Sequence, residues 1–263
     1  MLGKLMKYEW KATWKLLLPM NMLIIVMTFL ACVTVQVDFF DSDNSMVIFS
    51  AMMILLTYIG SMFVVCIGTA IYLIYRFYTS TYGDQGYLLH TLPVDKHHII
   101  IAKVAVSAAW IFISMMLVFM SVMFLFAEQG EFLVDITEAF ESVIEYWGGS
   151  EVSGFVLIMT FIATVFHIFA RVLKVTACVS LGQLSSDHKV IMSFAFYFAF
   201  YFVQRIFTML YYVFIEILNH ANESYRFSYF DNSWEGTLIS SILYSVVFYL
   251  LTWYVMDKKL NLE

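Results

Sequence analysis

The chain has 263 residues, of which 62% are hydrophobic and only 13% are charged, and its mean hydropathy is +0.83. Soluble domains are roughly 45–50% apolar and about 25% charged, so this composition excludes an ordinary soluble α/β enzyme. The net charge of −6 gives no indication of a nucleic-acid partner. We therefore expect most of the chain to lie in membrane lipid.

The first 15 residues have the pattern of an amphipathic helix. Lysines recur on one stripe and tryptophans lie on another side, a combination typical of a helix in the inner headgroup layer. The sequence predicts an interfacial helix over residues 2–15, whose membrane-contacting residues include Lys4, Lys7, Trp10, Lys11 and Trp14. The alternative is that these lysines only orient the span that follows.

Six apolar stretches are each long enough to cross the hydrocarbon core as a helix, which takes about 20 residues. They lack the alternating pattern of the short strands of an outer-membrane barrel. We therefore predict an all-α integral membrane protein, with a single six-helix domain over residues 1–263. Its spans are expected at about 16–36, 46–75, 97–127, 152–181, 190–217 and 236–256.

The distribution of basic residues predicts the orientation of these spans. If the N-terminus is cytoplasmic, all of the 14 Lys and Arg residues except Arg205 and Arg226 fall in inner segments. Cytoplasmic segments of membrane proteins are enriched in these two residue types. Both termini are therefore expected in the cytoplasm.

The cytoplasmic loop after the second span reads YGDQGYLLHTLPVDKHH. It combines turn-forming glycines with a short apolar run that a proline ends. An apolar run on a polar loop indicates a docking surface, although the loop also has the option of folding back on its own helix ends. The docking residues that we single out are Tyr82, Gly83, Asp84, Gly86, Tyr87, Leu88, Leu89 and Pro93.

Motifs of catalysis and metal binding are absent from the sequence. There is no GxxxxGK[ST] phosphate-binding loop, and neither HExxH nor GxSxG occurs. The three cysteines lie in separate apolar stretches without CxxC spacing, which gives no indication of a zinc site or a disulfide framework. We predict no catalytic residue, no metal site and no cofactor in this chain.

Arg205 lies inside the fifth apolar stretch. A guanidinium in hydrocarbon costs at least about 2.5–3.5 kcal/mol on insertion scales, so Arg205 should face protein or water, or lie near an interface. Arg205 is therefore the candidate residue for a translocation pathway.

Taken together, these features resemble the small permease subunits of bacterial type-2 ATP-binding-cassette (ABC) transporters. The resemblance covers the whole chain in architecture: a basic amphipathic start, six spans and a loop after the second. Similarity at the level of residues is confined to Tyr82–Lys96 and to Lys258–Leu262 near the C-terminus.

The resemblance implies a multi-pass protein of the bacterial plasma membrane, in contact with its lipids. Two permease subunits, identical or homologous, would form the pathway, and a dimer of separate ABC ATPase subunits would bind beneath them. ATP and magnesium would be held by those ATPase subunits, so this chain would not itself be an enzyme. The loop from Gly83 to Pro93 would be the coupling element, and an amphipathic peptide, a drug or a lipid would be exported.

The resemblance also bears on Arg205, because related permeases often have a break in the fifth span. We therefore expect the helix to end near Arg205, with residues 206–217 dipping back into the outer leaflet. Arg205 would then cap the break. The alternative is a continuous tilted helix from which Arg205 reaches the outer interface.

A different functional class remains open: a stand-alone six-helix secondary transporter or a membrane sensor. Secondary transporters usually have ionisable groups or broken helices at mid-membrane, where this sequence offers mainly Arg205. Copurification of an ATPase would distinguish the two classes, since only an ABC permease requires one.

Overall fold

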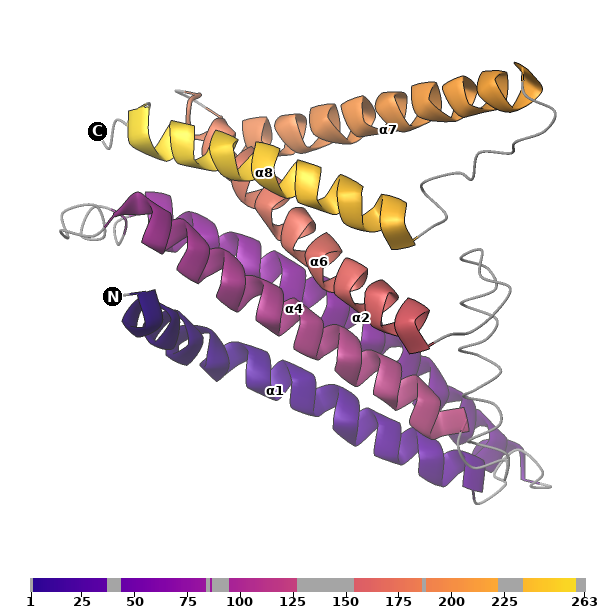
Figure 1. Cartoon of the computed structure of the whole chain (residues 1–263). Coiled ribbons are helices and arrows are strands. Elements are labelled where there is room, and N and C mark those ends of the chain that lie inside the picture. The colour runs from indigo at the N-terminus through magenta and orange to yellow at the C-terminus, as the bar shows by residue number, and fades with distance from the viewer. Residues whose placement is uncertain are drawn as a thin grey trace. The chain divides into compact units, whose positions relative to one another are not determined.

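The computed structural model describes residues 2–36, 44–83, 86, 95–126, 154–185, 188–221 and 234–258. Within these ranges the chain forms long α-helices and no strand (Figure 1). The helices are α1 (Leu2–Gln36), α2 (Ser45–Tyr82), α4 (Lys96–Phe126), α6 (Gly154–Gly182), α7 (Lys189–Ala221) and α8 (Trp234–Lys258). All six are long and apolar enough to cross a membrane, which confirms the predicted all-α protein with six candidate spans.

Helix α1 is continuous over 35 residues, and Pro19 lies inside it without ending it. The sequence predicted an interfacial helix over residues 2–15 followed by a separate span from residue 16. No helix end falls between them. The location of residues 2–15 in the headgroup layer stays a prediction.

Helix α2 extends beyond the predicted end of the second span near residue 75 and ends at Tyr82. Its last two turns contain polar residues that a hydropathy pattern places outside the membrane. They stay helical because their side chains pack inside the protein: Phe77, Ser80 and Thr81 are all buried. At 38 residues the helix is about 57 Å long, so it must tilt or project beyond a hydrocarbon core of roughly 30 Å.

The chain divides into two compact units. The first unit comprises residues 1–76 and 105–140, and the second comprises residues 77–104 and 141–263. Helices α2 and α4 contribute residues to both units. Helices α6, α7 and α8 belong to the second unit alone.

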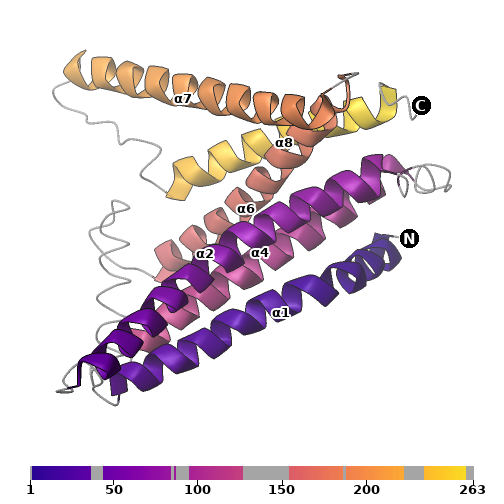
Figure 2. The ribbon, with the colours of Figure 1, turned by 180° about the vertical axis from the view of Figure 1, so that it is seen from behind.

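In the first unit, α1 runs alongside α4, as both ribbon views show (Figures 1 and 2). Trp110 of α4 is only 3% exposed and belongs to a cluster of buried apolar side chains from α1, α2 and α4. Trp10 stacks on Trp110 with ring centroids 4.8 Å apart, and Trp14 meets it edge-on at 6.2 Å. The Trp110 indole N–H donates to Thr13 Oγ1 at 2.8 Å. These contacts fix the N-terminal half of α1 on α4.

A second contact in the first unit joins three helices through one hydroxyl. Ser121 of α4 lies 2.7 Å from the Thr28 hydroxyl of α1 and 2.8 Å from the Tyr58 hydroxyl of α2. All three residues are buried. Because no water is available in the hydrocarbon region, such hydroxyl groups need protein partners.

We expect Ser121→Ala to lower the free energy of unfolding of the first unit by about 1–2 kcal/mol, since two interhelical hydrogen bonds are lost. Cys32 is buried in this unit and serves as the reporter once the exposed Cys66 is replaced by serine. In that background, heating in detergent with N-ethylmaleimide should label Cys32 at a lower temperature in the variant.

The control is Ser50→Ala, because the Ser50 hydroxyl is exposed and its hydrogen bond among the described residues is to the carbonyl of Val47 in its own helix. It should leave the labelling temperature of Cys32 unchanged. An equal shift in both variants would contradict the role assigned to Ser121.

Candidate functional site

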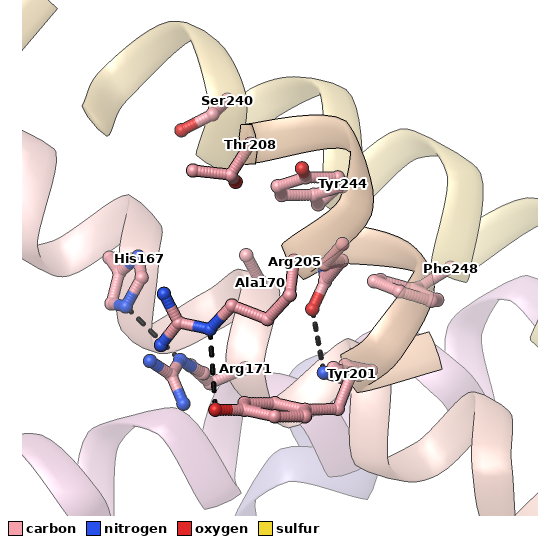
Figure 3. A pocket seen from close by; sticks show the side chains of 11 residues that line it. His167, Ala170, Arg171, Tyr201, Arg205, Thr208, Ser240, Tyr244 and Phe248 are labelled. Atoms are coloured by element: carbon pink, nitrogen blue, oxygen red, sulfur yellow. Dashed lines mark hydrogen bonds between the residues drawn. The ribbon is translucent and has the colours of Figure 1, made fainter. Parts of the chain in front are cut away.

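A cavity of about 190 Å³ lies between helices α6, α7 and α8 of the second unit (Figure 3). Helix α6 packs against both α8 and α7, which brings three polar helix faces together. The cavity is lined by His167, Ala170, Arg171, Lys174, Tyr201, Gln204, Arg205, Thr208, Ser240, Tyr244 and Phe248.

Three of these lining residues are cations: Arg171 and Lys174 from α6, and Arg205 from α7. No acidic side chain is among the lining residues that the structure describes. The ion pairs found in the described ranges involve Arg76, Lys96 and His98 instead. The cavity therefore carries a net positive charge that its described neighbours do not neutralise.

Lys174 is the most deeply buried of the three cations, at 4% exposure. Its ammonium group donates to Gln204 Oε1 at 2.6 Å. It also lies 4.9 Å from the ring centroid of Tyr197 and 5.6 Å from that of Tyr201. An amide oxygen and two aromatic faces replace part of the hydration of the ammonium without cancelling its charge.

Arg205 makes its described contacts with a single aromatic residue of its own helix. Its Nε donates to the Tyr201 hydroxyl at 3.3 Å, and its guanidinium lies 5.2 Å from the Tyr201 ring centroid. Helix α7 continues without interruption through Arg205 to Ala221. The predicted break after Arg205 is therefore wrong, and Arg205 caps no freed carbonyls. The physical reason is that residues 206–217 contain neither proline nor glycine, the usual causes of a sharp kink.

His167 and Arg171 form a pair one turn apart on α6. The Nε–H of Arg171 donates to His167 Nε2 at 3.1 Å, so this nitrogen must carry a lone pair. A neutral imidazole then has its proton on Nδ1, which lies 3.3 Å from Ser241 Oγ and donates to it. In this arrangement His167 is neutral and orients Arg171 without pairing its charge.

The positions of Lys174 and Arg205 along their helices give their depth if α6 and α7 span a membrane. Lys174 lies about 12 Å along α6 from its end at Gly182, and Arg205 about 24 Å along α7 from its start at Lys189. If α6 and α7 cross a hydrocarbon core of roughly 30 Å, both cations lie within it. Ionisable residues at such depth are costly and usually mark functional sites. Arg205, the sequence-predicted pathway residue, thus lies in a cluster of cations.

Of the predicted docking residues, the structure describes Tyr82, Gly83 and Gly86. The Tyr82 hydroxyl donates to Ser180 Oγ near the end of α6 at 2.6 Å. The Gly86 N–H donates to the Gly83 carbonyl at 2.7 Å, and a Cβ at Gly86 would collide with the Thr81 carbonyl. A tight turn that requires glycine therefore follows α2. Asp84, Tyr87, Leu88, Leu89 and Pro93 lie outside the described residues.

The other end of this loop is joined to α8. Lys96 at the start of α4 lies 3.1 Å from Asp257, which precedes the C-terminal segment Lys258–Leu262. His97 stacks on Trp253, with ring centroids 5.3 Å apart, and its Nδ1 lies 2.6 Å from the Tyr249 hydroxyl. The ends of the two segments that resemble ABC permeases are thus adjacent in space, although 161 residues separate Lys96 from Asp257.

The predicted membrane-interface residues differ in their surroundings. Lys4, Lys7 and Lys11 are exposed, whereas Trp10 is half-buried and faces Trp110. Trp14 is 48% exposed but also contacts Trp110. Trp10 therefore packs on protein, because a flat indole surface is available on α4. Contact of the three lysines with lipid headgroups stays a prediction.

The spacing of three residues on α6 indicates the cavity, although the assignment of cations to inner and outer segments did not use it. His167, Arg171 and Lys174 are spaced by four and three residues, which places them on one face of a helix. The predicted orientation counts Arg171 and Lys174 among the residues of inner segments, although both lie inside the fourth span predicted at 152–181. Comparison of the chain with protein-family models, curated proteins and solved structures finds no match.

Proposed function

We propose that the chain is the permease subunit of a bacterial type-2 ABC transporter, coupled to a separate ATPase. The observation that carries this proposal is the segment YGDQGYLLHTLPVDKHH, which connects the last turn of α2 to the first turn of α4. Both helix ends on either side of it are tied to other helices: Tyr82 to Ser180 of α6, and Lys96 to Asp257 of α8.

These contacts suggest how a movement of the loop reaches the cavity. Residues 77–104 and helices α6, α7 and α8 belong to the same compact unit. A displacement of the loop by the ATPase would act on α6 through Tyr82 and on α8 through Lys96. Helices α6 and α8 form two walls of the cavity that contains Arg205.

The remaining parts of the proposal follow from the same resemblance. The ATPase subunits would hold ATP and magnesium, and a second permease subunit would complete the pathway. The protein would lie in the bacterial plasma membrane with both termini in the cytoplasm. Export of an amphipathic peptide, drug or lipid is the transport reaction that we propose.

The double variant Tyr87→Asp/Leu88→Asp should release the ATPase. Apolar and aromatic anchors dominate the energetics of such docking surfaces, and two buried carboxylates would each lack a partner. Affinity purification of the tagged chain from its native membrane should recover at least about tenfold less ATPase with the variant.

The control is Leu184→Asp, which places a carboxylate on an exposed apolar residue in the connection between α6 and α7. It should leave ATPase recovery within about twofold of the parent chain. Equal recovery of the ATPase with the double variant, in a protein that still inserts into the membrane, would remove the main support for coupling through this loop.

The cationic cavity favours a second candidate, a stand-alone secondary transporter, because such proteins bind substrate between ionisable groups at mid-membrane. The same purification separates the candidates. Recovery of no ATPase, together with transport driven by an ion gradient in liposomes that contain only this chain, would favour the second one.

A further inference from the structure

We propose that the cavity between α6, α7 and α8 binds the phosphate group of an anionic, lipid-like amphiphile. This binding would be a property of the second unit by itself and does not depend on coupling to an ATPase. It follows from the charge of the cavity, the direction of its donors and the apolar helix surface next to it.

Two guanidinium groups lie at the cavity with their donors available to an anion. Figure 3 draws both between His167 and Tyr201, with Arg171 bonded to the former and Arg205 to the latter. Each arginine uses its Nε for a neutral partner. Within the described residues, no partner of the terminal nitrogens of either arginine is seen. Those nitrogens are donors arranged as a fork, the geometry that binds phosphate oxygens in pairs.

Mutual repulsion of the three cations makes the cavity costly without a bound anion. Arg171, Arg205 and Lys174 are like charges around one cavity, and their repulsion grows as the effective dielectric constant falls. The described lining offers hydroxyl, amide and aromatic groups to these cations but no carboxylate. An anion in the cavity would replace this repulsion by charge-assisted hydrogen bonds. The volume of about 190 Å³ is well above the roughly 10–15 Å³ that one water needs by the same measure, so a group of several non-hydrogen atoms fits.

An apolar helix surface beside the cavity suits the rest of the ligand. Arg205 lies on a helix whose apolar side chains are largely exposed in this chain, among them Phe202, Ile206 and Phe207. Within the candidate membrane span of α7, none of the described residues is buried. Acyl chains or another apolar tail can lie along this surface while the phosphate reaches the cavity. A lipid-like anion therefore fits better than a free, fully hydrated one.

The test uses the purified full chain in a neutral detergent, analysed by native mass spectrometry. We expect phosphatidylglycerol to bind at least about tenfold more tightly than phosphatidylcholine with the same acyl chains. Arg171→Gln/Arg205→Gln should abolish this preference, because both donor forks are lost. Lys189→Gln, which removes an exposed charge from the same helix outside the cavity, should retain the preference within about twofold.

Inorganic phosphate distinguishes the source of the anion. Preference for phosphatidylglycerol that persists in excess phosphate supports an amphiphile, and saturable phosphate binding without any lipid preference overturns the proposal in favour of a soluble anion. Equal binding of the two lipids by the parent chain would overturn it even if the double variant did not fold. Arg205→Lys, which keeps the charge and loses the fork, should retain part of the preference.

Discussion

Replacement of Trp110 by alanine should lower the free energy of unfolding of the first unit by about 3–5 kcal/mol, the range measured for buried large aromatic residues. Trp110 packs with Leu17, Leu73 and Val106 and carries the ring contacts to Trp10. Its removal leaves a cavity in the cluster that joins the N-terminal half of α1 and the C-terminal half of α2 to α4.

The measurement follows the labelling of Cys32 by N-ethylmaleimide on heating, in the Cys66→Ser background. Trp110→Ala should shift Cys32 labelling strongly to lower temperature and leave that of Cys178, which is buried in the second unit, almost unchanged. Phe124→Ala is the control on the same helix, because Phe124 is 58% exposed. Parallel shifts for Cys32 and Cys178 would contradict the division into two units.

Trp110→Phe separates the contribution of packing from that of the hydrogen bond. Phenylalanine keeps an aromatic ring in the cluster but cannot donate to Thr13. The Thr13 hydroxyl retains the carbonyls of Glu9 and Trp10 as partners, so it is not left unsatisfied. We expect a loss of about 1 kcal/mol, much less than for alanine.

Gly182→Ala should lower the free energy of unfolding of the second unit by about 2–3 kcal/mol, because the added methyl group has no room. A Cβ at Gly182 would lie 2.7 Å from the carbonyl oxygen of Lys189 and 2.8 Å from the backbone nitrogen of Ser193. Both are backbone atoms at the start of α7, which cannot move unless the corner between α6 and α7 opens. Since α6 and α7 are two walls of the cationic cavity, its geometry should change as well.

Two other helical glycines provide matched controls. Nothing lies within 4 Å of a Cβ at Gly60, so Gly60→Ala should stabilise α2 by about 0.5–1 kcal/mol. A Cβ at Gly68 would meet only the flexible end of Met20, and Gly68→Ala should be close to neutral. The labelling temperature of Cys178 should fall for Gly182→Ala, whereas that of Cys32, the reporter of the first unit, should rise slightly for Gly60→Ala and stay unchanged for Gly68→Ala. If Gly182→Ala behaves like Gly68→Ala, the close approach of α6 and α7 is not present in solution.

The number and type of the helices could be predicted from the sequence because a membrane span is a property of a single segment. An apolar run of sufficient length satisfies its own backbone hydrogen bonds and its own solvation by lipid. Helix ends were less predictable, because they also depend on contacts with other segments. The last turns of α2, through Tyr82, are polar and are held by neighbouring helices, and hydropathy does not record such neighbours.

Arg205 was correctly marked by the sequence as an unusual residue, whereas the helix break predicted beside it was wrong. Its residue type and its position in an apolar stretch marked it as unusual, and the structure places it in a cavity. The prediction of a helix break rested on the resemblance to ABC permeases. The residues after Arg205 contain no proline or glycine that would break a helix. In this case the local sequence was the better guide to local structure.

The sequence by itself determined six apolar helices, an uneven distribution of cations and one connecting segment with a distinctive pattern, since each depends on composition and spacing along the chain. Only the tertiary structure decided which of these groups meet. Arg171 and Lys174 join Arg205 because α6 packs on α7, and Lys96 meets Asp257 because the end of α8 lies beside the start of α4. Such contacts depend on side-chain packing between distant segments, where small residues such as Gly182 permit close approach, and neither hydropathy nor local spacing encodes them.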